Sequence, residues 1–118
     1  MNVPAAIIAF SQSEKIKSGL IWITQALELL SGLSTTEQQG AEKVIKTIID
    51  MISQEIHVAR NLTKDDSLND IEKHMDMALV MINSQMTPES GYHLIQALTR
   101  VTSLGQRSMS VLKEKGLL

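Results

Sequence analysis

The residues that could bind a metal ion or move protons are three histidines, each with a glutamate close by in the sequence. The pairs are Glu55 with His57, Glu72 with His74, and Glu89 with His93. Carboxylate-bridged metal pairs in helical bundles need a glutamate three residues before a histidine, because that spacing puts both ligands on one helix face. Glu55 and His57 instead diverge by about 160° around a helix. The spacing therefore predicts no metal site and no metal cofactor.

One of the three histidines has the surroundings of a phosphoryl acceptor. His57 lies opposite the apolar line that contains Ile45 and Ile52, so its ring should face solvent. Arg60 follows about one helical turn later, where its guanidinium could pair with phosphate oxygens. A solvent-facing imidazole beside a fixed cation can accept a phosphoryl group at neutral pH. His57 and Arg60 are therefore a candidate phosphoacceptor pair.

The segment from Glu55 to Leu62 resembles the acceptor segment of histidine phosphotransfer domains, which are four-helix bundles of similar length. In that family a lysine or arginine follows the acceptor histidine by three positions, as Arg60 follows His57. The resemblance is confined to this short segment, and Asn61 stands where the family usually has glycine. The resemblance implies that this chain is a phosphorelay intermediate. The alternative is an exposed histidine whose partial charge suits the end of its helix.

A second set of potential ligands lies on one face of a later helix. Met77 and Met81 follow His74 by three and seven residues, which places all three side chains on the same side. An imidazole with two thioethers is a soft donor set that would suit Cu(I). The alternatives are a methionine-rich contact surface and ordinary packing, because methionine adapts to irregular gaps and to varied partners.

Composition disfavours several classes of function. The chain has no cysteine, which excludes thiolate chemistry, and only three aromatic residues, too few for a platform that stacks bases. Eleven basic and thirteen acidic residues form no basic stripe, so nucleic acid is not an expected partner. No apolar segment is long enough to cross a membrane, and we expect a cytoplasmic protein. Enzyme motifs such as phosphate-binding loops and nucleophile elbows are lacking, and we predict no enzyme activity.

The elements that must position these residues are four helices, because apolar residues recur at helical spacing in four separate runs. The runs are Ile16/Leu20/Ile23/Leu27/Leu30, Ala41/Ile45/Ile48/Ile52/Ile56, Leu68/Ile71/Met75/Ala78/Ile82 and Leu94/Leu98/Val101/Leu112. Residues that favour helix starts and stops separate the runs and predict helices over about 4–31, 35–60, 67–86 and 88–115.

The helix boundaries have recognisable sequence signals. Ser34 and Glu37 have the spacing of a capping box at the start of the second helix. Three dipeptides have the pattern of a Schellman stop: Gly32–Leu33, Asn61–Leu62 and Gly116–Leu117. Because the connections are short, consecutive helices should be antiparallel neighbours. We therefore predict one domain over 1–118, an all-α, antiparallel, up-down-up-down four-helix bundle.

Apolar side chains surround more of each helix than one core-facing stripe can hide. We expect outward-facing residues to form the interface of a homodimer or higher oligomer: Ile21, Trp22, Ile49, Met77, Val80 and Met81. The predicted function is protein–protein interaction, as an adaptor or chaperone-like protein that docks a second copy or a partner helix. The alternatives are scattered surface residues without a role, and a bundle whose interior, lined by methionine and isoleucine, holds a small apolar ligand.

Overall fold

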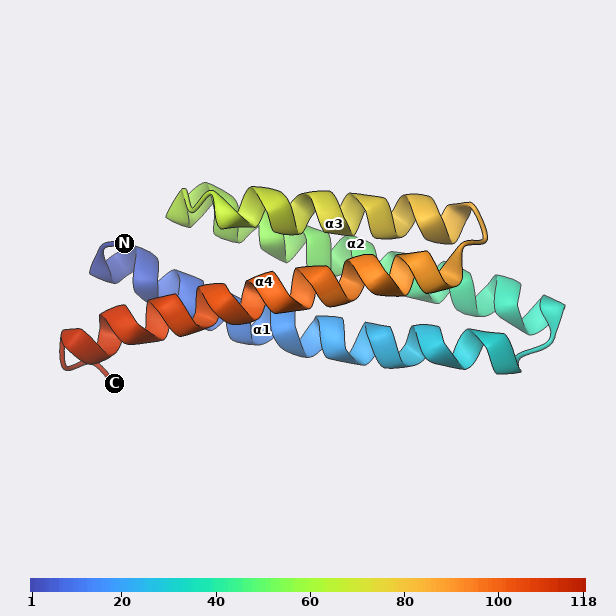
Figure 1. Ribbon diagram of the computed structural model, residues 1–118, viewed down its shortest axis with the longest axis horizontal. Helices are drawn as coiled ribbons and strands as arrows, with labels where there is room; N and C mark the ends of the chain where they lie inside the picture. The colour runs from blue at the N-terminus through green and yellow to red at the C-terminus, as the bar shows by residue number, and fades with distance from the viewer.

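The computed structural model describes residues 1–118, and its four α-helices alternate in direction along the chain (Figure 1). The helices are α1 (Val3–Glu28), α2 (Thr35–Thr63), α3 (Ser67–Asn83) and α4 (Thr87–Glu114), and a short 3-10 helix (Leu29–Gly32) continues α1. α1 and α3 each pack on α2 and α4 and lie diagonally across the bundle from one another. The predicted all-α, up-down-up-down four-helix bundle is confirmed.

The helices are staggered along the 53 Å long axis of the molecule. Both chain termini lie at one end, where α1 and α4 extend beyond the start of α3 (Figure 1). At the other end the connection between α1 and α2 extends beyond the turn between α3 and α4 (Figure 1). α3 has only 17 residues and cannot cover its longer neighbours. Each overhanging end is therefore built from fewer helices than the middle, which leaves apolar side chains such as Leu29 exposed.

Local hydrogen bonds explain where the first two long helices start. The Asn2 side chain accepts a hydrogen bond from the Ala5 N–H at 2.8 Å and so caps α1. At the start of α2 the Glu37 N–H donates to Ser34 Oγ at 3.3 Å, and the Ser34 N–H donates to the Glu37 carboxylate at 3.0 Å. The bond from the Ser34 backbone holds the pKa of Glu37 below its usual value. The predicted capping box is confirmed.

The predicted stop at Gly116–Leu117 is also confirmed, because the end of α4 forms a complete Schellman motif. Gly116 has a φ of 71°, a left-handed conformation that glycine adopts without strain. The Leu117 N–H donates to the Leu112 carbonyl at 2.8 Å, and the Gly116 N–H donates to the Lys113 carbonyl at 3.0 Å. These two bonds satisfy carbonyl groups that the helix leaves free at its last turn.

The other two predicted Schellman motifs are not formed, although helical structure does end at Gly32 as predicted. Gly32 is not left-handed, and the chain there tightens into the 3-10 helix instead. α2 continues through Asn61 to Thr63 and ends at Lys64, whose φ is 58°. Ala59 is still buried in the core at this point. Packing therefore carries the helix one turn further than the sequence pattern indicates.

The core is one cluster of 20 buried residues from all four helices. On α2 its members include Ile45, Ile49, Ile52 and Ile56, whereas Ile48 is only partly buried. Ile48 and Ile49 lie about 50° on opposite sides of the line through Ile45 and Ile52, so the helical pattern alone does not choose between them. The prediction that Ile49 belongs to an outer interface is therefore wrong, because its side chain is 0% exposed. No helix has the length and apolar character needed to span a lipid bilayer.

Candidate functional site

His57 and Arg60 lie one turn apart on the flank of α2 that faces α3, where Glu72 meets both side chains. The Arg60 guanidinium donates to the Glu72 carboxylate, and His57 Nδ1 lies 3.3 Å from the other oxygen of that carboxylate. Arg60 Nη2 lies 3.1 Å from the same Nδ1. A neutral His57 can accept from Arg60, and a protonated His57 can donate to Glu72. The imidazole is exposed as predicted, with 56% of its side chain accessible, but neither it nor Arg60 is free.

An acidic groove lies beside His57 and Glu72. It measures about 700 Å³ and is lined by Asp50, Ser53, Gln54, His57, Val58, Glu72 and Asp76. A phosphoryl group brought to His57 would meet three carboxylates, and Arg60 already pairs with one of them. The negative charges of these carboxylates repel a phosphoryl group in the same groove. The geometry therefore disfavours the phosphoacceptor role of His57 and Arg60, and predicts that a phosphorylated receiver domain will leave His57 unlabelled.

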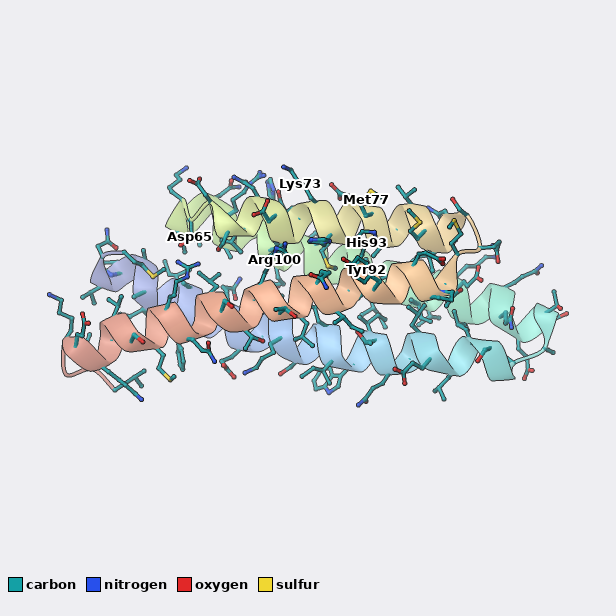
Figure 2. The ribbon with its side chains drawn as sticks, viewed as in Figure 1. Asp65, Lys73, Met77, Tyr92, His93 and Arg100 are labelled. Carbon is teal, nitrogen blue, oxygen red and sulfur yellow. The ribbon has the colours of Figure 1, made fainter.

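The structure brings together two other histidines that are far apart in the sequence. His74 of α3 and His93 of α4 are both half-buried, and their Nδ1 atoms lie 3.0 Å apart. Figure 2 shows His93 and Arg100 on the side of α4 that faces α3. Burial lowers the pKa of His74, the positive charges of Arg100 and His93 lower it further, and the negative charge of Asp70 opposes them. The sequence prediction missed this pair because its members come from different helices.

Several exposed apolar side chains lie along the contact between α1 and α2. Lys15 Nζ lies 2.9 Å from Glu55 Oε1, and Gln12 donates to the same carboxylate at 3.0 Å, so these residues fix the register of the two helices. A Cβ at Gly19 would lie 3.1 Å from Ile52, which shows how closely the backbone of α1 approaches α2 there.

Two lines of exposed apolar side chains run on the outer side of this contact. Trp22 of α1 and Leu29, the first residue of the 3-10 helix, follow Lys15 by one and two heptads, and both are 70% exposed. On α2, Met51 and Val58 lie one turn on either side of Glu55, and Val44 lies a heptad before Met51. Val58 also borders the acidic groove on the α3 side. The exposed fractions of Val44, Met51 and Val58 are 60%, 59% and 46%. We call these five residues the α1–α2 face.

The predicted interface residues do not form one surface. Ile21 and Trp22 are exposed on α1, and Met77 and Val80 are exposed on α3, diagonally across the bundle. Met81 is partly buried. The sequence prediction missed the three α2 residues of the α1–α2 face. Their seven-residue spacing is a signal that the sequence contains, and each of them directly precedes a core residue.

The interior of the bundle is not lined by methionine. Met75 is the one fully buried methionine of seven, and the core consists mainly of isoleucine, leucine and alanine. An apolar hollow instead lies on the surface, in a groove of about 590 Å³ between the end of α1 and the start of α4. Leu27, Pro88, Tyr92 and Ile95 are among its lining residues. A small apolar ligand would therefore bind at this groove, and the prediction of such a ligand stays untested.

No group of three or more histidine, aspartate or glutamate side chains is arranged to hold a metal ion. Comparison of the chain with protein-family models, with curated proteins and with solved structures found no match. The function therefore has to be inferred from the surfaces described above.

Proposed function

We propose that this chain acts in protein–protein interaction and that its α1–α2 face pairs with the same face of a second copy to form a homodimer. The observation that carries the proposal is the exposure of five large apolar side chains in two neighbouring seven-residue lines. Folded monomers rarely leave a contiguous apolar surface of this kind in water, because its burial is favourable by about 25 cal/mol per Å². A seven-residue spacing on two adjacent helices suits a helical partner surface.

The register of the two helices makes the face complementary to itself. Because Lys15 is level with Glu55 and Gly19 is level with Ile52, Trp22 lies at a height between Met51 and Val44. A two-fold axis parallel to the helices would set α1 of each copy against α2 of the other. Trp22 would then enter the gap between Met51 and Val44 of its partner, and Lys15 would face the partner's Glu55. In such an isologous contact, apolar side chains would pack on apolar side chains and opposite charges would face one another.

An adaptor also needs a surface that dimerisation leaves free. Met77 and Val80 of α3 are exposed on the other side of the bundle, away from the α1–α2 face. Methionine-rich surfaces adapt to partners of varied shape, which suits adaptor or chaperone-like work. We expect the protein to do this in the cytoplasm, and fractionation of the source cells tests that location.

The test is the mass of the protein in solution, measured by native mass spectrometry and by sedimentation equilibrium at micromolar concentration. The wild-type chain should be a dimer. Trp22→Glu should make it monomeric, because each interface would then bury two uncompensated charges. Val80→Glu is the matched control, since it puts the same charge on an exposed site of α3 and should leave the dimer intact. A wild-type monomer, or a dimer that only Val80→Glu dissociates, would contradict the proposal.

A further inference from the structure

The His74–His93 pair lies on the α3–α4 side of the bundle and has no part in the proposed dimer. Each histidine contributes Nδ1 to a separation of 3.0 Å, and the ring centroids lie 5.2 Å apart. Two long helices hold the rings, and Ser90 Oγ, one turn before His93, donates to the Ala78 carbonyl at 2.8 Å and fixes the register of α3 and α4. Two imidazole nitrogens are thus held close together by a rigid part of the fold.

The separation of the two nitrogens selects a coordination geometry. Suppose that a metal ion lies about 2.0–2.1 Å from each nitrogen while the nitrogens stay 3.0 Å apart. The angle between the two metal–nitrogen bonds is then about 95°. This angle matches two neighbouring positions of a square-planar or tetragonal ion and is smaller than the tetrahedral angle that zinc prefers. Cu²⁺ and Ni²⁺ take such geometry with imidazole ligands, and Cu²⁺ binds more tightly of the two.

We propose that His74 and His93 form a two-histidine site for a divalent transition-metal ion, with Cu²⁺ as the preferred ion. The metal would take the Nδ1 lone pair of each ring. The ring that donates Nδ1–H in the present hydrogen bond would shift that proton to Nε2 through solvent, so two neutral rings bind without net loss of a proton. Water would complete the coordination shell.

Charged neighbours act on this site in opposite directions. Asp70, one turn before His74, contributes a negative charge that favours a cation. Arg100 contributes a positive charge, and its guanidinium donates to the Gln96 side chain at 3.2 Å. The charge of Arg100 therefore opposes a bound cation and offsets the charge of Asp70. The donor set differs from the His74, Met77 and Met81 face considered from sequence, because imidazole nitrogens suit Cu²⁺ and thioethers suit Cu(I).

The experiment titrates the metal-free protein with a copper(II) salt and follows binding by calorimetry and electron paramagnetic resonance. The wild-type chain should bind one Cu²⁺ per chain, with hyperfine splitting from two imidazole nitrogens. His74→Gln and His93→Gln should each weaken binding at least about tenfold, because even the loss of an outer-shell partner has an effect of that size. His57→Gln is the matched control and should keep the wild-type affinity and spectrum.

Several results would overturn the proposal: no Cu²⁺ bound by the wild type, a spectrum with a single imidazole nitrogen, or equal loss of binding in His57→Gln. Glutamine is a good helix former, so the variants should keep the fold, and circular dichroism verifies this. As an independent readout, saturating Cu²⁺ should raise the melting temperature of the wild type and of His57→Gln but not of the double variant His74→Gln/His93→Gln. A rise in all three would place the copper elsewhere on the chain.

Discussion

The two exposed edges of α2 differ in chemistry although their residues are neighbours in the sequence. The edge toward α3 contains Asp50 and His57, which line the acidic groove, and the edge toward α1 contains the exposed side chains of Val44 and Met51. Val58 lies between the two edges and also borders the groove. On the first edge His57 finds partners inside the chain, in Glu72 and Arg60. On the second edge the apolar side chains remain in water. The fold accounts for the polar edge, and the proposed dimer would account for the apolar edge.

The largest predicted loss of stability comes from a substitution on the buried side of α2, between these two edges. Ile49→Ala should lower the free energy of unfolding by about 3 kcal/mol, because it leaves a cavity in a fully packed site. Denaturant unfolding measures this loss. Ile48→Ala removes the same atoms from a partly buried position and should cost clearly less. An equal or larger loss at Ile48 would mean that the two edges have been assigned to the wrong sides.

The second effect concerns the apolar edge. The double variant Met51→Gln/Val58→Gln should weaken self-association by about 30-fold, which corresponds to about 2 kcal/mol of lost apolar burial. Sedimentation equilibrium measures the dissociation constant. The unfolding free energy of the monomer, measured at concentrations where it is dissociated, should stay unchanged. Asp50→Gln places the same side chain on the polar edge and should leave association as it is.

A smaller effect is expected on the polar edge. Glu72→Gln should lower the free energy of unfolding by about 1 kcal/mol, because the carboxylate accepts a charged hydrogen bond from Arg60 and is only 20% exposed. Glu55→Gln should cost less, since the side chain of its partner Lys15 is 62% exposed. Thermal and denaturant unfolding of the two variants give the comparison. A greater loss for Glu55→Gln would reverse our ranking of the two edges.

The smallest effect is the acid response of Glu55. Hydrogen bonds from Gln12 and from Lys15 lower the pKa of Glu55 below its ordinary value of 4.5. The folded chain therefore binds fewer protons than the unfolded chain in this range, and the stabilisation present above pH 4.5 disappears as the pH falls through the lowered value. Glu55→Gln should make the melting temperature fall less steeply on acidification below pH 4.5 than in the wild type. Identical slopes would show that the contact with α1 does not form.

The sequence predicts the features of this fold that depend on local chemistry. The capping box at Ser34 and the stop at Gly116 are found as predicted, because each needs only a few consecutive residues. The topology also follows, since short connections leave antiparallel packing as the simple arrangement. The stop at Asn61 failed because burial of Ala59 overrides a weak local signal.

The candidate sites depend on register between helices, which no single helix contains. His74 meets His93 only because α3 and α4 align, and Arg60 is neutralised only because Glu72 lies opposite. Whether Ile48 or Ile49 is buried depends on the rotation of α2 about its own axis, by an angle smaller than the roughly 100° between adjacent residues of a helix. Four of the six predicted interface residues are therefore exposed, Ile21 and Trp22 on α1 and Met77 and Val80 on α3, and these two helices lie diagonally across the bundle.

Trp22 offers the most direct test of the central claim, because it is the only tryptophan in the chain and lies on the α1–α2 face with 70% of its surface exposed. Its fluorescence should be recorded over a wide range of protein concentration, with a soluble quencher present in a parallel series. If two copies pair through this face, the emission will move to shorter wavelength and quenching will weaken as the dimer forms. An emission spectrum that stays unchanged while the measured mass doubles would place the interface elsewhere and contradict the account.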